Sequence, residues 1–155
     1  MNLIKKQKRI ELEIEDLKKE GILLKVLKKD SQEYIFKVKL VGPPDTAFEG
    51  GSYILKFNVK LETYPFSPPS VKMLSKIFHP NISQDSICLD ILSSEWTCTY
   101  TTSSVVRSIQ LLISTPNPDS PLDSDAANAY KGNPKSFKVK NQTLIKENNL
   151  IPLQW

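Results

Sequence analysis

The residues best suited to chemistry in this 155-residue chain lie in one short run, IFHPNISQDSICLDIL, from Ile77 to Leu92. The run contains the only histidine, His79, and one of the two cysteines, Cys88. Such a pair could form a dyad in which the imidazole takes the thiol proton. His79 directly precedes Pro80, however, and a histidine held in extended geometry more often hydrogen-bonds the local turn than acts as a mobile base. Cys88 could equally be a buried, inert thiol.

A metal site has less support than a dyad. Structural zinc is held by four ligands, with cysteines typically in close pairs. The chain offers one histidine and two cysteines, Cys88 and Cys98, without a CxxC spacing. The sequence therefore predicts no metal centre.

Composition narrows the class of protein. With 39% hydrophobic and 25% charged residues, the chain resembles an ordinary globular domain that is long enough to bury a core without disulfides. Two cysteines make no disulfide framework, which favours a reducing compartment. Lysines and polar residues interrupt every apolar run, so the sequence predicts no membrane span.

The net charge of +4 raises the question of a nucleic-acid partner. Basic residues cluster near the start, at Lys5, Lys6 and Arg9, and other lysines alternate with apolar residues along apparent strands. The sequence has no RNP-type signature and no zinc-finger spacing. We expect no nucleic-acid partner, and the lysines form either a solvated face or a docking patch for an acidic protein.

The first element that must support the reactive run is a helix. Leu3, Ile10, Ile14 and Leu17 recur at helical spacing, and Gly21 follows them as a C-terminal cap.

Alternation of apolar and polar residues predicts two strong strands, EYIFKVKLV at 33–41 and SYILKFNVKL at 52–61. A weaker strand, ILLKVL, precedes them at 22–27, and a short one lies around Val71 and Met73. Turn-forming sequences separate the strands at short intervals, so the prediction is an antiparallel meander. One face of that sheet would be apolar and would need helices to cover it.

After the strands, the apolar residues show no clear periodicity until the segment TTSSVVRSIQLLIS at 101–114, where they recur at helical spacing. DSDAANAYK at 123–131 is typical of a short helix, and Asn133 and Pro134 are typical of the cap and first position of a last helix. We expect a single α+β domain over 1–155, in which a four-stranded antiparallel meander sheet is flanked by an N-terminal helix and C-terminal helices. Chemistry is expected in the irregular segment, because loops on a rigid scaffold commonly carry reactive groups.

The order of these motifs resembles the catalytic core of ubiquitin-conjugating enzymes. HPNISQDSICLDIL is followed by Trp96 and then by PNPDSPL, while GPPDTAFEGG and YPFSPP precede it in the family order. The tripeptide with its downstream cysteine and tryptophan is the most specific part, and the likeness covers nearly the whole chain. The family's fold of four antiparallel strands with flanking helices agrees with the periodicity.

The resemblance implies a transferase with a thioester intermediate. Cys88 would accept the C-terminus of ubiquitin from the ubiquitin-activating enzyme, and a lysine amine of a substrate protein would then attack the thioester. Asn81 matches the amide that stabilises the oxyanion, although it could instead brace the loop, and both roles can coexist. His79 and Pro80 would hold the loop that aims Asn81. No cofactor is implied, because ATP is used by the activating enzyme and is not bound here.

Three further residues match positions that line the attacking side of the thioester in the family. A carboxylate there can orient a lysine ammonium, and desolvation lowers the lysine pKa. The acids could instead cap helices or lie solvated in loops. These positions are Asp90, Asp119 and Ser120.

The family's docking positions carry over as well. Lys5, Lys6 and Arg9 match the basic first helix that docks the activating enzyme. Phe66 of YPFSPP supports a RING-type or similar ubiquitin ligase as partner. The ligase-docking positions are Phe66, Trp96, Thr97 and Cys98.

Three departures from the common pattern affect these roles. The six residues ISQDSI between Asn81 and Cys88 are one fewer than is common and include no glycine, which tightens the loop. Ser120 stands where many members carry an aspartate. Thr97-Cys98-Thr99 replaces a common Ser-Pro-Ala and changes the stiffness of that loop.

Ubiquitin is the expected modifier rather than SUMO, because CLDILSSEW has no acidic insertion before Trp96. The alternative function is a catalytically impaired ubiquitin-binding scaffold of the same fold, and the presence of Cys88 argues against it. We expect a monomer in the cytoplasm, the nucleus or both. The PDSPLDSDAAN run resembles peroxisomal-import members, which would add association with the peroxisome surface.

Overall fold

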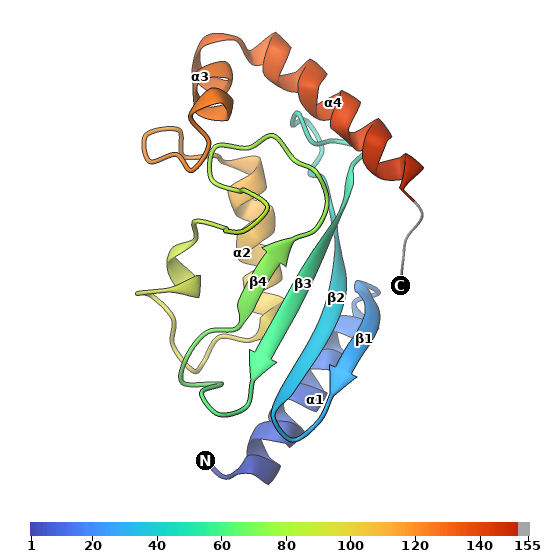
Figure 1. Ribbon diagram of the computed structural model, residues 1–155, viewed down its shortest axis with the longest axis vertical. Helices are drawn as coiled ribbons and strands as arrows, with labels where there is room; N and C mark the ends of the chain where they lie inside the picture. Colours follow the sequence, from blue (N-terminus) through green and yellow to red (C-terminus); the bar gives the residue numbers. More distant parts are fainter. Residues whose placement is uncertain (152–155) are drawn as a thin grey trace.

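The computed structural model describes residues 1–151. Figure 1 shows an open sheet with α1 and α2 behind it and with α3 and α4 at one end. The predicted α+β architecture, with its four-stranded antiparallel sheet and flanking helices, is confirmed. The elements in chain order are α1 (Leu3–Lys19), β1 (Leu23–Lys29), β2 (Glu33–Val41), β3 (Ser52–Lys60), β4 (Ser70–Met73), a short 3-10 turn η1 (Asp90–Leu92), α2 (Thr102–Ser114), α3 (Ser124–Gly132) and α4 (Pro134–Leu150).

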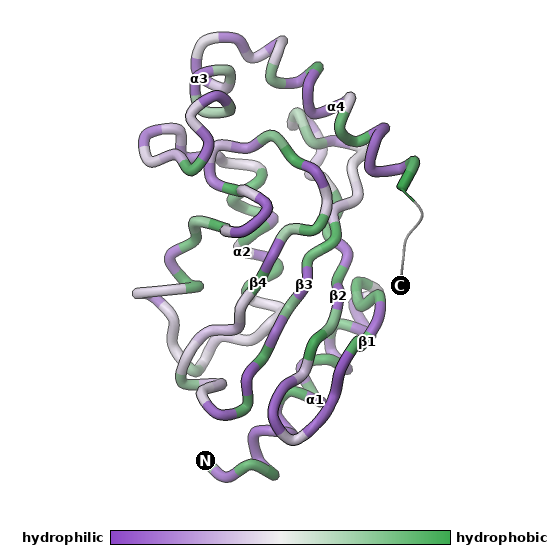
Figure 2. Tube along the Cα trace, in the orientation of Figure 1, coloured by the Kyte–Doolittle hydropathy of each residue, from purple (hydrophilic) through white to green (hydrophobic). Residues whose placement is uncertain are grey.

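The sheet is a meander in which the strands pair in sequence order and every pair is antiparallel. Figure 2 shows hydrophobic and hydrophilic stretches interleaved along the strands, as expected for a sheet with one buried face. Burial of each large side chain on that face contributes about 1.5–3 kcal/mol. The inward residues of β2 and β3, with Leu61 just after β3, are 2% exposed or less: Tyr34, Phe36, Val38, Leu40, Tyr53, Leu55, Phe57, Val59 and Leu61.

Helix α1 ends just before Gly21 as its sequence predicts, and Asn2 caps its start. The side chain of Asn2 accepts a hydrogen bond from the Lys5 amide at 2.9 Å, and Gly21 takes a φ of 75°, which favours glycine after a helix. Ile10 and Leu17 are fully buried against the core. Leu3 remains 43% exposed, because the first turn of α1 extends past the end of the sheet (Figure 1).

The helices after the irregular segment are also capped, and the cap predicted for the last of them is confirmed. Thr101 and Ser104 form a capping box at the start of α2, which fixes where that helix begins. Asn133 caps α4 by accepting from the Ser136 amide at 3.1 Å, and Pro134 occupies the first position. Between β4 and α2, residues 74–101 contain no regular element other than η1.

Candidate functional site

His79 is a buried structural ring. It is 0% exposed, its Nδ1 accepts from the Asn81 amide at 2.9 Å, and its Nε2 lies 2.9 Å from the Leu112 carbonyl. Because Nδ1 accepts, Nε2 carries the proton and donates to that carbonyl at the end of α2. Burial lowers the pKa of His79 to about 4, so the ring is neutral at physiological pH. Its geometry is that of a brace and not that of a mobile base.

Pro80 extends the brace to the segment before α3. Its carbonyl accepts from the Leu122 amide at 2.7 Å and from the Asp123 amide at 3.1 Å. Pro80 is itself buried. The loop that carries the cysteine is therefore tied to the chain about forty residues downstream.

Asn81 fastens a third segment, through both ends of its side-chain amide. Its Oδ1 accepts from the Asn117 amide at 2.8 Å, and its Nδ2 donates to the carbonyls of Asn117 at 2.8 Å and Ser120 at 3.3 Å. Asn81 is 2% exposed. The loop-bracing role is thus visible in the geometry. The oxyanion role stays a prediction. For that role, Asn81 Nδ2 must give up one of its hydrogen bonds to a backbone carbonyl and donate instead to the negatively charged oxygen that forms during transfer.

Cys88 is exposed and carries a free thiol. It is therefore not the buried, inert thiol that the sequence left open. Its amide donates to the Asn81 carbonyl at 2.9 Å, so the two residues lie side by side. The tightened loop between them is a turn closed by a hydrogen bond from the Ser83 amide to the Ser86 carbonyl at 2.9 Å. Ile82 and Ile87, 1% and 8% exposed, anchor this turn in the core.

The three predicted lysine-positioning residues lie around this loop. Asp90 is exposed and begins η1, two residues after the cysteine. Asp119 and Ser120 are exposed, and the Ser120 carbonyl is held by the Asn81 amide. The Asp119 amide donates to the Asn117 side chain at 3.2 Å. The Asn81 brace therefore places the 117–120 segment beside the reactive loop.

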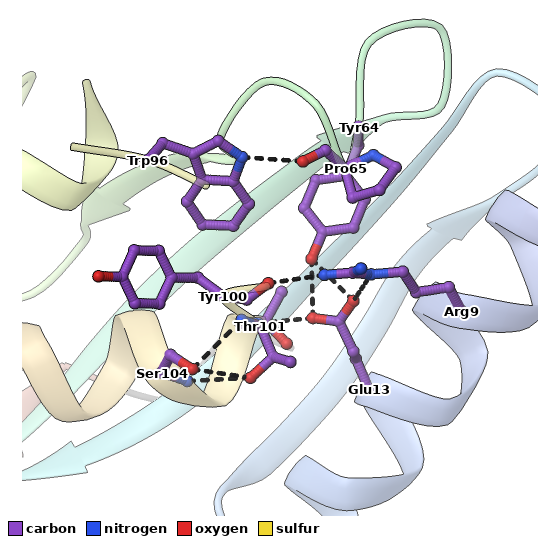
Figure 3. Close-up of polar contacts among 9 residues, drawn as sticks. Arg9, Glu13, Tyr64, Pro65, Trp96, Tyr100, Thr101 and Ser104 are labelled. Atoms are coloured by element: carbon purple, nitrogen blue, oxygen red, sulfur yellow. Dashed lines mark hydrogen bonds and ion pairs between the residues drawn. The ribbon is translucent and has the colours of Figure 1, made fainter. Parts of the chain in front are cut away.

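The sequence reading missed the centre of a second polar cluster, Glu13, which is 5% exposed (Figure 3). Its carboxylate accepts from the Tyr64 hydroxyl at 2.7 Å, from the Thr102 amide at 2.6 Å and from Arg9 Nε at 3.1 Å. A signal was present, because position 13 falls on the apolar face defined by Ile10 and Leu17, where a carboxylate needs partners.

Two of the three residues predicted to dock an activating enzyme already have partners within the chain. Arg9 donates to the Tyr100 carbonyl at 2.6 Å and lies over the Tyr64 ring. Lys6 Nζ donates to the carbonyls of Leu61 and Glu62, at 2.7 and 2.9 Å. Lys5 is exposed. Arg9 and Lys6 thus position α1 against the loops after β3 and before α2.

The residues predicted to dock a ligase divide into exposed and structural ones. Phe66 is 62% exposed, and Thr97 and Cys98 are exposed. Trp96 is half-buried, and its indole N–H donates to the Pro65 carbonyl at 2.8 Å (Figure 3). Trp96 joins the two loops, and Phe66 stays exposed on the surface with Lys6 Nζ 5.9 Å from the centre of its ring.

Residues 1–151 hold no group of three or more His, Cys, Asp or Glu side chains placed to bind a metal ion. No helix among those residues is both long enough and apolar enough to cross a bilayer.

Comparisons with known proteins agree with this arrangement. Residues 5–145 match the sequence profile of the ubiquitin-conjugating enzymes. Ubiquitin-conjugating enzyme E2 K of Homo sapiens is 48% identical over 102 residues, which cover 64% of this chain and 50% of that protein. Ubiquitin-conjugating enzyme E2 1 of Caenorhabditis elegans is 42% identical over 109 residues, covering 70% of this chain and 56% of that protein. The chain spans about half the length of the curated relatives it matches.

Among solved structures, the E2 domain of a Toxoplasma gondii ubiquitin conjugating enzyme superposes with a TM-score of 0.79 at 32% identity. The match covers 90% of this chain and 96% of that one. The profile spans nearly the whole chain, including Cys88. The chain therefore belongs to the ubiquitin-conjugating enzyme family.

Proposed function

We propose that this chain is an acyl carrier for ubiquitin, which it receives as a thioester on Cys88 and transfers to a lysine amine. The observation that carries the proposal is the exposed, free thiol of Cys88, held beside Asn81 in a loop that the His79–Asn81 tripeptide fastens to the core. The membership of the chain in the family supports the same activity.

In the loading step, the Cys88 thiolate attacks the carbonyl carbon of the donor thioester. The bond from that carbon to the donor's sulfur breaks, and the donor cysteine leaves as a thiolate. One thioester replaces another, so the step is nearly balanced in free energy and needs only a reactive sulfur that the donor can reach. The exposure of Cys88 supplies that access.

In the transfer step, a neutral lysine amine attacks the carbonyl carbon, the new C–N bond forms and the Cys88 thiolate leaves. The proton lost by the amine passes to solvent. Asp90 and the Asp119–Ser120 pair would orient the incoming ammonium, and Asn81 would donate to the oxyanion. Losing one such donor typically costs about 10²–10³ in rate.

The partners follow from the exposed docking residues. Activating enzyme would contact α1 near Lys5, and a RING-type ligase would contact Phe66 with Thr97 and Cys98. The exposure of these side chains supports both proposals. We place the activity in a reducing compartment, the cytoplasm or nucleus, because it depends on a free thiol.

The test is a charging assay with activating enzyme, ubiquitin and ATP. We expect a thiol-sensitive adduct that is absent in Cys88→Ala and present in the matched control Cys98→Ala, which removes the other exposed thiol. An adduct that persists in Cys88→Ala contradicts the proposal. A chain that binds ubiquitin but never forms the adduct would instead be the scaffold alternative, which the exposed cysteine and the family do not favour.

A further inference from the structure

One row of residues runs straight across the sheet on the face that the helices leave uncovered. Lys25 pairs with Lys37, Lys37 pairs with Lys56, and Lys56 pairs with Lys72. The row, here called the lysine row, therefore takes one residue from each of the four strands. Neighbouring strands lie about 4.8 Å apart, so the row extends over roughly 14 Å.

The surroundings of the lysine row add positive charge and little negative charge. Three more lysines lie on the same face, Lys28 opposite Ile35, Lys39 opposite Ile54, and Lys60 opposite Glu33. Lys28 pairs with the carboxylates of Glu33 at 2.7 Å and Asp30 at 3.5 Å, so the added positive charge comes from Lys39 and Lys60. Within the described part of the chain, no acidic side chain lies within ion-pair distance of Lys25, Lys56 or Lys72.

Like charges directly opposite one another on a sheet are destabilising. A row of four maximises that repulsion, because each inner lysine faces two others. The acids within residues 1–151 do not offset it for Lys25, Lys56 and Lys72. An external anionic surface that contacts Lys25, Lys56 and Lys72 at once would do so.

The chemistry of the face discriminates among anions. The aromatic side chains of the central strands, including Phe36 and Phe57, point to the buried face, so these strands present no ring that could stack on a base. Both arginines lie elsewhere, Arg9 on α1 and Arg107 on α2, so the face lacks the bidentate forks that select phosphopeptides. Nucleic acid and phosphopeptide are therefore poorer fits than a surface that binds through charge alone.

The shape of the face argues against an acidic peptide. Three cavities that lie among the described residues have other linings, without Lys25, Lys37, Lys56 or Lys72. A docked peptide is held by side chains that enter pockets, whereas a lipid surface needs none. Aliphatic Ile35 and Ile54 flank the row and are only partly buried, which suits the boundary between headgroups and acyl chains.

We propose that the lysine row is a peripheral docking site for an anionic phospholipid membrane. Lysines held near such a surface each strengthen binding, and the strength depends on salt. Cys88 is on none of the four strands and lies in the segment that runs past the β4 edge (Figure 1). Docking through the sheet would leave the thiol open to solution, so that ubiquitin transfer could proceed at the membrane.

The test is co-sedimentation of the full chain with phosphatidylcholine vesicles that do or do not contain phosphatidylserine. The triple variant Lys25→Gln, Lys56→Gln, Lys72→Gln removes three charges from the row and should lower the partition coefficient about 100-fold. The matched control, Lys131→Gln, Lys135→Gln, Lys138→Gln, removes three exposed charges from α3 and α4 and should bind like the unaltered chain. Binding should also weaken with added salt.

Three results overturn the proposal: equal loss in the two triple variants, equal binding to vesicles without phosphatidylserine, or binding to polyglutamate or single-stranded RNA with none to vesicles. The charging assay is run in parallel on every variant. We expect Cys88 loading to be unchanged in both triple variants, so a failure at the membrane is separable from a failure of the proposed ubiquitin transfer.

Discussion

At the scale of single residues, His79, Pro80 and Asn81 each fasten the reactive loop to a different part of the chain. They contact the end of α2, the start of α3 and the segment at 117–120 respectively. Sequence reasoning predicted that the histidine would hydrogen-bond locally, since proline follows it. It could not tell that the Asn81 amide has carbonyl partners, because both lie at least 36 residues away.

The buried His79 makes stability depend on pH. Its native pKa of about 4 lies below the ordinary 6.5, so between these values the unfolded chain binds a proton that the native chain does not. The neutral, buried ring therefore contributes about 3 kcal/mol to the free energy of unfolding above about pH 6.5. This contribution is lost as the pH falls to about 4. Urea denaturation across this window should show the loss, and His79→Gln should lack it. An imidazole proton resonance that titrates near 6.5 contradicts this.

Asn81→Ala separates the two roles of that amide. We expect Cys88 to charge nearly normally, and discharge to free lysine to slow about 100-fold if the oxyanion donor is lost. The Asn117 amide, which donates to Asn81 Oδ1, should exchange its hydrogen faster than in the unaltered chain. If the thioester discharged at the original rate while the Asn117 amide hydrogen exchanged faster, Asn81 would only brace the loop and would not stabilise the oxyanion.

At the scale of elements, the Glu13 cluster joins α1 to the two loops that carry the docking residues. The strands and helices were predictable because their apolar residues alternate or recur at helical spacing. The contacts of Lys6 and Arg9 were not, because their acceptors are backbone carbonyls 55 and 91 residues away, which leave no trace in side-chain type. Lys6 and Arg9 would be exposed on an isolated helix, but in the folded chain they donate hydrogen bonds to the loops that pack against α1.

Removing the Glu13 side chain should be costly. Glu13→Ala leaves the Tyr64 hydroxyl, the Thr102 amide and Arg9 without their acceptor in a buried site, and we expect a loss of about 3–5 kcal/mol in the free energy of unfolding. Glu15→Ala, two positions on and exposed, is the matched control and should change it by less than about 0.5 kcal/mol. Equal effects in urea denaturation would show that the cluster carries no special stability.

At the scale of the whole molecule, one face of the sheet builds the core and the other concentrates positive charge. The alternation that predicted the buried face also placed the lysines on its reverse. Which lysines oppose each other depends on register, however, and β1 has irregularities at 23–25 and 26–28 that periodicity does not reveal. The lysine row therefore emerged only from the folded sheet.

The lysine row predicts that lost charge will add stability. Lys56→Thr relieves repulsion from both neighbours in the row and places a β-branched residue in a strand, so we expect a gain of about 0.5–1 kcal/mol in low salt. The gain should shrink in high salt, where the repulsion is screened. Chemical denaturation at two ionic strengths measures the gain and its dependence on salt. A gain that is equal at the two ionic strengths would show that strand propensity alone causes the effect.

The position of Trp96 has a practical consequence. Its indole N–H donates to the Pro65 carbonyl, and its ring contacts those of Tyr64 and Tyr100, each with its centroid 5.9 Å away. The fluorescence emission of Trp96 should therefore change whenever a bound ligase shifts the loop that carries Phe66. With the second tryptophan silenced by Trp155→Phe, ligase arrival could be timed in a stopped-flow instrument without attaching a dye.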